Sequence, residues 1–174
     1  MRNTQALLTQ YAHYHRDPRN IATHFVGVPM IVLAVGVLLA RASMELGGWT
    51  VSAAWLAWAA STVWYLSRGH LGAGVTVSAA IAGLMVLAHP LAAGSTASWL
   101  AWGLGLFGVG WVIQFVGHYY EGRKPAFVDD LVGLLVGPLF VSTEVLFALG
   151  LCRPLRQAIE AEAGPVRLRT PQSA

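Results

Sequence analysis

The stretch SWLAWGLGLFGVGWVIQFVGHYY, residues 98–120, contains no Asp, Glu, Lys or Arg. Three more stretches share this property, at 21–40, 49–66 and 69–93. A helix needs roughly 20 apolar residues to cross the hydrocarbon core of a bilayer, and each stretch can meet that need. The one at 49–66 is the shortest, so it needs little tilt or a locally thin bilayer. These stretches predict an all-α fold, a polytopic membrane helix bundle.

A fifth apolar stretch, 131–151, brings the expected number of hydrophobic helices to four or five. It contains the pair Gly137-Pro138, which breaks or kinks a helix because proline lacks a backbone N–H. A full span would carry the arginines that follow it to the outer face, so we favour a kinked hairpin that returns to the cytoplasm. Its one charged residue, Glu144, is costly in lipid. Glu144 is therefore either a functional group or a protonated or hydrogen-bonded part of the bundle.

The composition agrees with a membrane protein and excludes several kinds of site. Of the 174 residues, 56% are hydrophobic and 11% are charged, which is more apolar surface than a soluble domain of this size can bury. The net charge of +3 does not indicate nucleic-acid binding, because the basic residues flank the hydrophobic stretches instead of forming a stripe. With Cys152 as the one cysteine, any metal must be held by nitrogen and oxygen.

Basic residues gather in alternate connections between the apolar stretches. The other connections hold only Arg41, beside Glu45, so the positive-inside rule places the N-terminus in the cytoplasm. The first 20 residues lack the apolar core of a signal peptide, and we expect the first hydrophobic stretch to act as an internal signal. The basic residues on the cytoplasmic side are Arg2, Arg16, Arg19, Arg68, Arg123 and Lys124.

Polar segments flank the hydrophobic ones. Residues 4–16 predict a short N-terminal amphipathic helix on the membrane surface, with Leu7, Leu8 and Tyr11 on one side. Residues 164–174 mix Pro, Arg, Thr and Ser without periodicity and predict a flexible tail. The expected organisation is a single integral membrane domain, 1–163, followed by this tail.

Histidines concentrate at the cytoplasmic ends of the stretches. Imidazole is a common ligand of iron and zinc, so helix ends that bring several together would form a metal site; isolated interfacial histidines are the alternative. His118 and Glu121 are three residues apart and share a helical face, and a proline-containing turn separates His15 from His24. His13 faces away from His15, and His70 lies in a glycine-rich connection that leaves its place open. The cytoplasmic set is His13, His15, His24, His70 and His118, and His89 lies at the opposite end.

Two segments carry a family resemblance: YAHYHRDPRNIATHFVGVP (11–29) and QFVGHYYEGRKPAFVDDLVGLLVGPLFVSTE (114–144). In the first, a Tyr-His pair is followed by Asn20, His24 and Gly-Val-Pro. The second contains, in this order, Gln114, Gly-His, Glu121, Pro-Ala, Asp and Pro-Leu-Phe. Together they resemble the membrane family typified by the fungal iron-dependent 2-hydroxy fatty acid dioxygenase.

The resemblance implies an enzyme that uses Fe(II) and O2 to cleave the C1–C2 bond of a long-chain 2-hydroxy fatty acid, giving a fatty acid one carbon shorter. It also implies metal ligands at His15, His24 and His118, with Glu121 or His70 as open additions. Because the substrate is anionic, three cations near this face are candidates for its head group or, alternatively, topology anchors beside lipid phosphates. They are Arg123, Lys124 and Arg19.

Other interpretations stay open at this stage. A lipid-binding or transport protein without redox activity would use Glu144 and the segment around Pro138 as a polar pathway. A haem protein would need two histidines at matching depth on facing helices. Membrane lipid is the expected surrounding in every case, and the sequence leaves the oligomeric state open.

Overall fold

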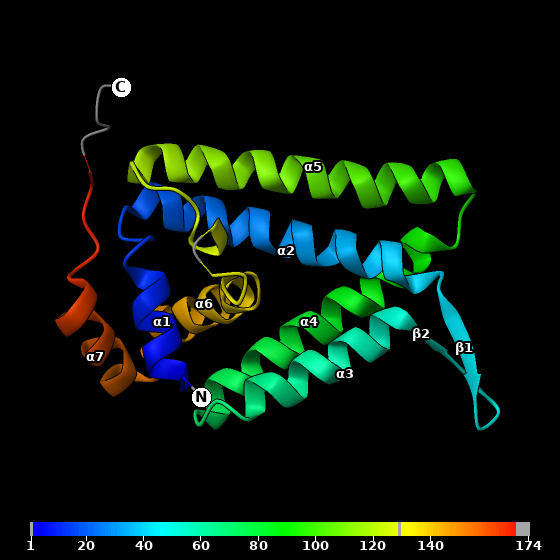
Figure 1. The fold of residues 1–174 in the computed structure, drawn as a ribbon, viewed down its shortest axis with the longest axis horizontal. Helices are drawn as coiled ribbons and strands as arrows, with labels where there is room; N and C mark the ends of the chain where they lie inside the picture. Colours follow the sequence, from blue (N-terminus) through cyan, green and yellow to red (C-terminus); the bar gives the residue numbers. More distant parts are fainter. Residues whose placement is uncertain (1, 129, 170–174) are drawn as a thin grey trace.

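Two long antiparallel helices, α2 (Pro18–Ala40) and α5 (Thr96–Glu121), lie side by side along the computed structural model, which describes residues 2–128 and 130–169 (Figure 1). Glycines let their backbones approach closely. A Cβ at Gly110 would lie 2.7 Å from Cγ1 of Ile31 and 3.1 Å from the carbonyl oxygen of Gly27, and a Cβ at Gly117 would collide with Thr23. The close contact brings the start of α2 level with the end of α5.

The two ends that meet have clear local causes. Asp17 caps α2 by accepting a hydrogen bond from the backbone N–H of Arg19, and Pro18 occupies the first helical position, where its missing N–H costs nothing. Gly122 ends α5 in a left-handed conformation with φ of 65°. Residues near the start of α2 and the end of α5 are therefore positioned by both helices.

A second antiparallel pair, α3 (Ala53–Leu66) and α4 (Leu71–Ala92), packs beside the first. The connection from α2 to α3 is a hairpin of β1 (Ser43–Leu46) and β2 (Trp49–Ser52). Its turn residues Gly47 and Gly48 have φ of 57° and 85°, as a tight hairpin turn requires. The stretch expected to be helical from residue 49 thus begins as a strand. The helix that remains has 14 residues and rises about 21 Å, less than a hydrocarbon core of about 30 Å.

The end of the bundle where α2 begins is closed by α1 (Thr4–Ala12), the 3-10 turn η1 (Ala126–Val128), α6 (Gly133–Ala148) and α7 (Arg153–Ala163) (Figure 1). Leu7, Leu8 and Tyr11 are buried, on the side that the amphipathic pattern predicted, and α1 packs against α6 and α7. The helix ends at Ala12 and not near residue 16. Residues 13–17 are consequently free to form a turn.

The break in the last apolar segment does not occur at Pro138. Helix α6 continues through this proline, and the chain instead bends by 117° between α6 and α7. Gly150 and Cys152 adopt φ of 76° and 52° there, the left-handed conformation that ends helices. Because α7 returns against α1, the arginines beyond α6 lie at the same end as the N-terminus.

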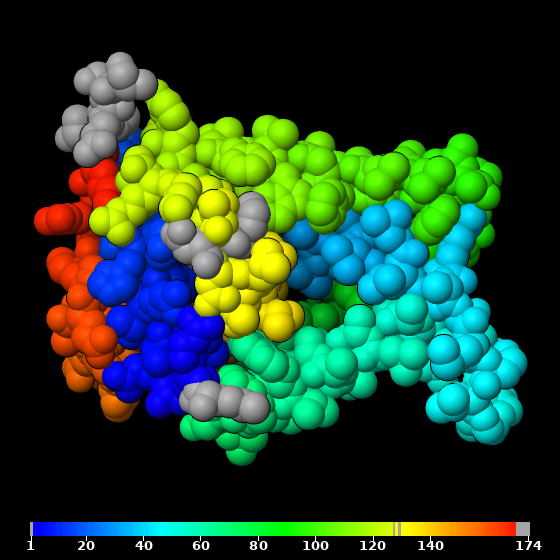
Figure 2. Space-filling model, in the orientation of Figure 1, coloured from blue at the N-terminus to red at the C-terminus, as the bar shows by residue number. Residues whose placement is uncertain are grey.

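The all-α membrane fold is confirmed. Within the described residues, α2, α4 and α5 are long and apolar enough to cross a membrane, and the bent pair α6 with α7 makes a fourth candidate. The count is three or four, where four or five were expected. Exposed apolar side chains such as Val63 and Val112 suit contact with lipid better than water. The space-filling view also shows a hollow between α2, α3 and the segment that leads into α6 (Figure 2).

Candidate metal centre

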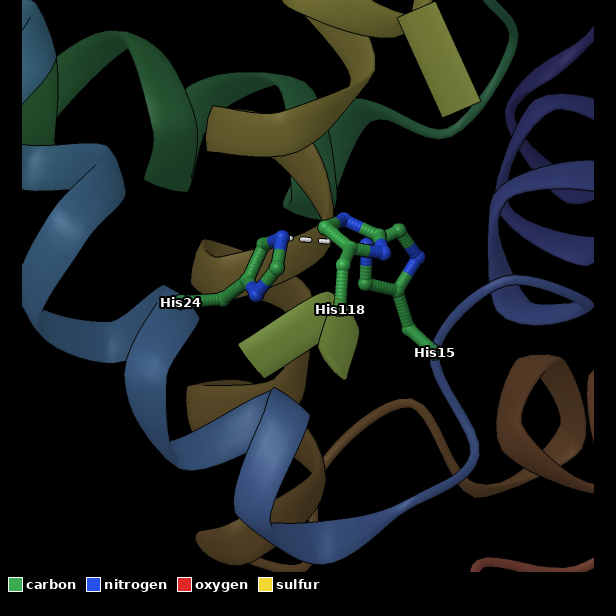
Figure 3. Close-up of side chains that lie close together, drawn as sticks. All are labelled: His15, His24 and His118. Atoms are coloured by element: carbon green, nitrogen blue, oxygen red, sulfur yellow. Dashed lines mark hydrogen bonds between the residues drawn. The ribbon is translucent and has the colours of Figure 1, made fainter. Parts of the chain in front are cut away.

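Three histidines meet inside the closed end of the bundle (Figure 3). His15 comes from the turn after α1, His24 from the second turn of α2, and His118 from the last turn of α5. All three are buried, and one ring nitrogen from each lies within 4.8 Å of the others. In residues 2–128 and 130–169, no other set of three or more His, Cys, Asp or Glu side chains meets in this way.

The backbone determines which nitrogen each imidazole presents. Nδ1 of His15 donates to the carbonyl oxygen of Tyr11 at 2.7 Å, and Nδ1 of His24 donates to the carbonyl oxygen of Asn20 at 2.8 Å. With the proton on Nδ1, a neutral imidazole carries a lone pair on Nε2. The Nε2 atoms of His15 and His24 are 3.0 Å apart (Figure 3). Two lone pairs therefore face each other, which is unfavourable unless a cation lies between them.

His118 supplies a third nitrogen. Its Nδ1 is buried and has no hydrogen-bond partner within the described part of the chain. A buried polar atom without a partner is costly, and a metal ion that accepts its lone pair would remove this cost. Three converging imidazoles of this kind fit a nitrogen-preferring transition metal such as iron or zinc.

The surroundings keep His15 neutral. Burial holds the pKa of His15 well below its ordinary value because the charged ring would lose its hydration, and the neighbouring rings of His24 and His118 lower this pKa further. The Tyr11 ring stacks on the His15 ring with centroids 4.0 Å apart and an interplanar angle of 6°. A neutral imidazole fixed by stacking can bind a metal without first losing a proton.

Glu121 lies beside this group without joining it. Its Oε2 accepts hydrogen bonds from the backbone N–H of Arg16 at 3.0 Å and of Asp17 at 2.8 Å, and from Nδ2 of Asn20 at 3.1 Å. Its Oε1 is 2.8 Å from Nε of Arg169, an ion pair by distance, although the two atoms are not aligned as a hydrogen bond. The carboxylate thus fastens the turn that carries His15 to the end of α5.

Part of the segment expected to be a flexible tail contacts the same turn. The backbone N–H of Arg169 donates to Oδ2 of Asp17 at 2.8 Å, and that of Arg167 donates to the carbonyl oxygen of Arg16 at 2.9 Å. Hydrogen bonds from the Arg19 side chain hold the pKa of Asp17 at about 2, so this carboxylate is charged. Residues 164–169 therefore run along the outside of the turn, and 170–174 lie outside the described residues.

The remaining candidate ligands are used elsewhere. His70 caps α4, where its Nδ1 accepts from the backbone N–H of Ala73 at 3.2 Å. His89 lies 3.0 Å from Oγ of Ser52 and stacks on Trp55, and His13 is exposed. Neither His70 nor Glu144 belongs to the histidine group.

The three candidate head-group cations lie in the first turn of α2 and in the connection after α5. Arg19 makes a two-point ion pair with Asp17 and stacks on the Tyr120 ring, 4.5 Å from its centroid. Arg123 donates to the carbonyl oxygen of His13 at 3.2 Å. Lys124 is exposed in the connection after α5.

One further residue stands out beside the histidines. A cavity of about 70 Å3 borders His24 and His118, and Gln114 lies in its wall. Gln114 is buried and its Nε2 has no hydrogen-bond partner among the described residues. Two sequence signals pointed to Gln114: its place in the second family motif, and its four-residue spacing from His118, which puts both side chains on one helical face.

Known proteins resemble this chain over the segments that build the centre. Residues 1–149 match the family described as "2-hydroxy-palmitic acid dioxygenase Mpo1-like". The chain belongs to the Mpo1-like family. A relative in this family, the 2-hydroxy-palmitic acid dioxygenase MPO1 of Saccharomyces cerevisiae, is 32% identical over 154 residues, covering 86% of this chain and 83% of its own length. No solved structure shows a significant match.

Membership of the Mpo1-like family confirms the resemblance seen in the sequence. The three histidines, Gln114 and Glu121 all lie inside the matched residues 1–149, whereas α7 and residues 164–169 lie beyond them. Arg169, which contacts Glu121 and Asp17, therefore belongs to a segment that follows the residues matched to the family.

Proposed function

We propose that this member of a dioxygenase family is an Fe(II)-dependent enzyme that cleaves the C1–C2 bond of long-chain 2-hydroxy fatty acids. The observation that carries the proposal is the pair of Nε2 lone pairs of His15 and His24, 3.0 Å apart, with His118 beside them. Imidazole nitrogens that converge in this way can bind a cation. The relative's name supplies the substrate class.

The proposed reaction needs no reductant other than its substrate. One O2 converts a 2-hydroxy acid to the acid one carbon shorter, and the atoms balance when C1 leaves as carbon dioxide with one water. Oxidising C2 to a carboxyl carbon and C1 to carbon dioxide releases four electrons, which is the number that O2 accepts. The chain shows no nicotinamide or flavin fingerprint, in keeping with this balance.

The protein's part is to hold the metal and orient the substrate. His15, His24 and His118 would bind Fe(II), which supplies the electron transfer that lets O2 react. A metal held by these three residues would supply the Lewis acidity that a hydroxyl and carboxylate of the substrate require. Glu121 keeps His15 in place through the turn, as outer partners of metal ligands commonly do.

Gln114 is the group best placed to orient the substrate's head. Its unpaired Nε2 in the wall of the cavity next to His118 can donate to a carboxylate oxygen. Arg123 and Lys124 follow the end of α5 and would attract the anion by charge. Arg19 is less suited to this role because Asp17 already neutralises it.

We further propose that the centre lies at the cytoplasmic face of the membrane. The turn with His15, the N-terminus and α7 all lie at one end of the bundle, and the β1–β2 hairpin lies at the other (Figure 1). The same end carries most of the basic residues, as the positive-inside rule requires of a cytoplasmic face.

The decisive experiment combines metal analysis with O2 uptake. Detergent-purified protein is loaded with Fe(II) without oxygen, and its iron content and its O2 uptake on 2-hydroxypalmitate are compared with those of His118→Ala. His89→Ala is the control, because His89 lies outside the histidine group. We expect His118→Ala to lose iron and uptake and His89→Ala to keep both. Wild-type protein that holds no iron and takes up no O2 would favour a lipid-binding protein instead.

A further inference from the structure

An apolar groove lies between the helices of the bundle, next to the cavity at the histidines. It is a cavity of about 350 Å3 between α2, α3, α4, α5 and α6, in the region where the space-filling view shows a hollow (Figure 2). It shares wall residues with the cavity at His24 and His118, so the two spaces lie next to each other. The shared residues are Ile31, Val32, Trp111, Leu134 and Pro138.

The walls of the groove suit a hydrocarbon chain. Most of the lining side chains are aliphatic or aromatic. The two hydroxyl groups among them already donate: Ser61 to the carbonyl oxygen of Trp58 at 2.9 Å, and Tyr65 to that of Leu135 at 2.9 Å. A polar ligand would gain little there, whereas an alkyl chain would bury its surface at about 25 cal/mol for each Å2.

The length of the groove can be measured along α2. Its wall on α2 reaches Leu39, 15 residues beyond His24, or about 22 Å at a rise of about 1.5 Å per residue. An extended alkyl chain of about 16 carbons, with C–C bonds of about 1.5 Å in a zigzag, is of similar length. Towards this end of the groove Met85 packs against Gly36, and Val37, Ala88 and Ala92 form a buried cluster of the same two helices.

We propose that this groove binds the alkyl chain of the substrate and that the packed residues in its far part, Gly36 and Met85, limit chain length. The proposal rests on the proposed function, because the carboxyl end then lies at the histidines. A phospholipid tail from the bilayer is the rival occupant. The wall that the groove shares with the cavity at His24 and His118 favours the substrate, since its reacting carbons would then lie close to the metal ligands.

The first test shortens the groove. Ala57 lines it on α3, near the level of Met85, because Trp55 of the same helix stacks on His89 of α4. In Ala57→Phe we expect kcat/KM for 2-hydroxypalmitate to fall at least about 10-fold relative to a 10-carbon 2-hydroxy acid, in line with the discrimination that pocket shape achieves. Ala59→Phe is the matched control, because Ala59 is exposed like Ala57 and lies on the same helix but does not line the groove. An unchanged chain-length profile in Ala57→Phe would refute the proposal.

The second test does not depend on turnover. A 16-carbon 2-hydroxy acid with a photoreactive diazirine at its terminal carbon is crosslinked to the metal-free wild-type chain, and the attachment site is mapped. We expect attachment near Ala57 and Met85, competed by palmitate and reduced in Ala57→Phe. Groove crosslinking by a protein that has no dioxygenase activity would support the groove and contradict the proposed function. Crosslinks confined to the outer faces of α4 and α5, or competed equally by phospholipid, would contradict the proposal that the groove binds the alkyl chain of the substrate.

Discussion

At the residue scale, the chemistry depends on which ring nitrogen each histidine turns toward its neighbours. His15 and His24 each give Nδ1 to a backbone carbonyl, of Tyr11 and Asn20 respectively, and turn Nε2 inward. Both carbonyls belong to residues four positions earlier in the chain, so helical or near-helical backbone sets the tautomer. The same side chains in extended backbone would lack these acceptors and would not hold their rings in this way.

Glu121 is predicted to act on the metal through the turn. In Glu121→Gln the side chain loses its charge and places an N–H group among N–H donors from Arg16, Asp17 and Asn20. We expect iron affinity to fall about 10- to 100-fold, the usual effect of losing an outer partner, while the protein stays folded. Competition with an iron chelator measures this, with Glu45→Gln in the hairpin as control. Equal affinity in the two variants would rule the positioning role out.

Gln114 is predicted to act on the substrate and not on the metal. Gln114→Ala removes the unpaired donor from the cavity wall. A hydrogen bond to a charged group contributes roughly 1.5–3 kcal/mol. In assays with 2-hydroxypalmitate we therefore expect the Michaelis constant to rise about 10-fold or more, at unchanged iron content. Gln114→Glu, which repels a carboxylate, should be worse. A Michaelis constant that stays at the wild-type value in both variants would exclude this role.

At the element scale, the contact between α2 and α5 positions two of the three histidines. His24 and His118 lie on these two helices, and the glycines between the helices determine how closely the rings approach. The distance between the helices therefore controls the size of the centre. A slight increase in the distance between α2 and α5 would weaken metal binding before it unfolded the bundle.

Gly117→Ala tests this dependence. A Cβ at Gly117 would collide with Oγ1 of Thr23 and lie 2.5 Å from Oδ1 of Asn20, whereas a Cβ at Gly105 would meet nothing within 4 Å. We expect Gly117→Ala to lose iron and about 1–3 kcal/mol of stability through overpacking. Gly105→Ala should be neutral or gain up to about 1 kcal/mol of helix propensity. Thermal unfolding in detergent, with iron analysis, compares them, and equal behaviour would disprove the argument.

At the scale of the whole molecule, the two ends of the bundle differ in composition. The end with the histidines carries α1, α7 and most of the basic side chains, and the other end carries the β1–β2 hairpin (Figure 1). Because α7 folds back on α1, both termini of the described chain lie at the histidine end. The sequence left this return open, since a full span at 131–151 was the alternative.

Labelling from either side of the membrane tests the orientation. In a Cys152→Ser background, which removes the one native cysteine, single cysteines are placed at Ser67, near the histidine end, and at Thr50, in the hairpin. We expect an impermeant maleimide to label Thr50→Cys in intact cells and Ser67→Cys only after the membrane is opened. The reverse pattern would invert the proposed topology, and labelling of both from outside would contradict a spanning bundle.

The sequence by itself determined the membrane class and the elements that patterns of charge and hydropathy can reveal. Uncharged runs of about 20 residues have few alternatives to helices in lipid, and α2, α4 and α5 follow them closely. The motifs around His15, His24 and His118 also identified the family. Local spacing predicted α1, whose buried side matches its apolar side.

Only the tertiary structure decided what depends on contacts between distant residues. The hairpin replaced the start of a predicted helix because Gly47-Gly48 favours a tight turn, a local preference that hydropathy does not register. Glu121 became a partner of the turn, and not of the histidine group, because donors more than 100 residues away in the chain converge on it. The groove, the unpaired Gln114 and the return of α7 likewise arise from packing between helices, which no spacing along one helix encodes.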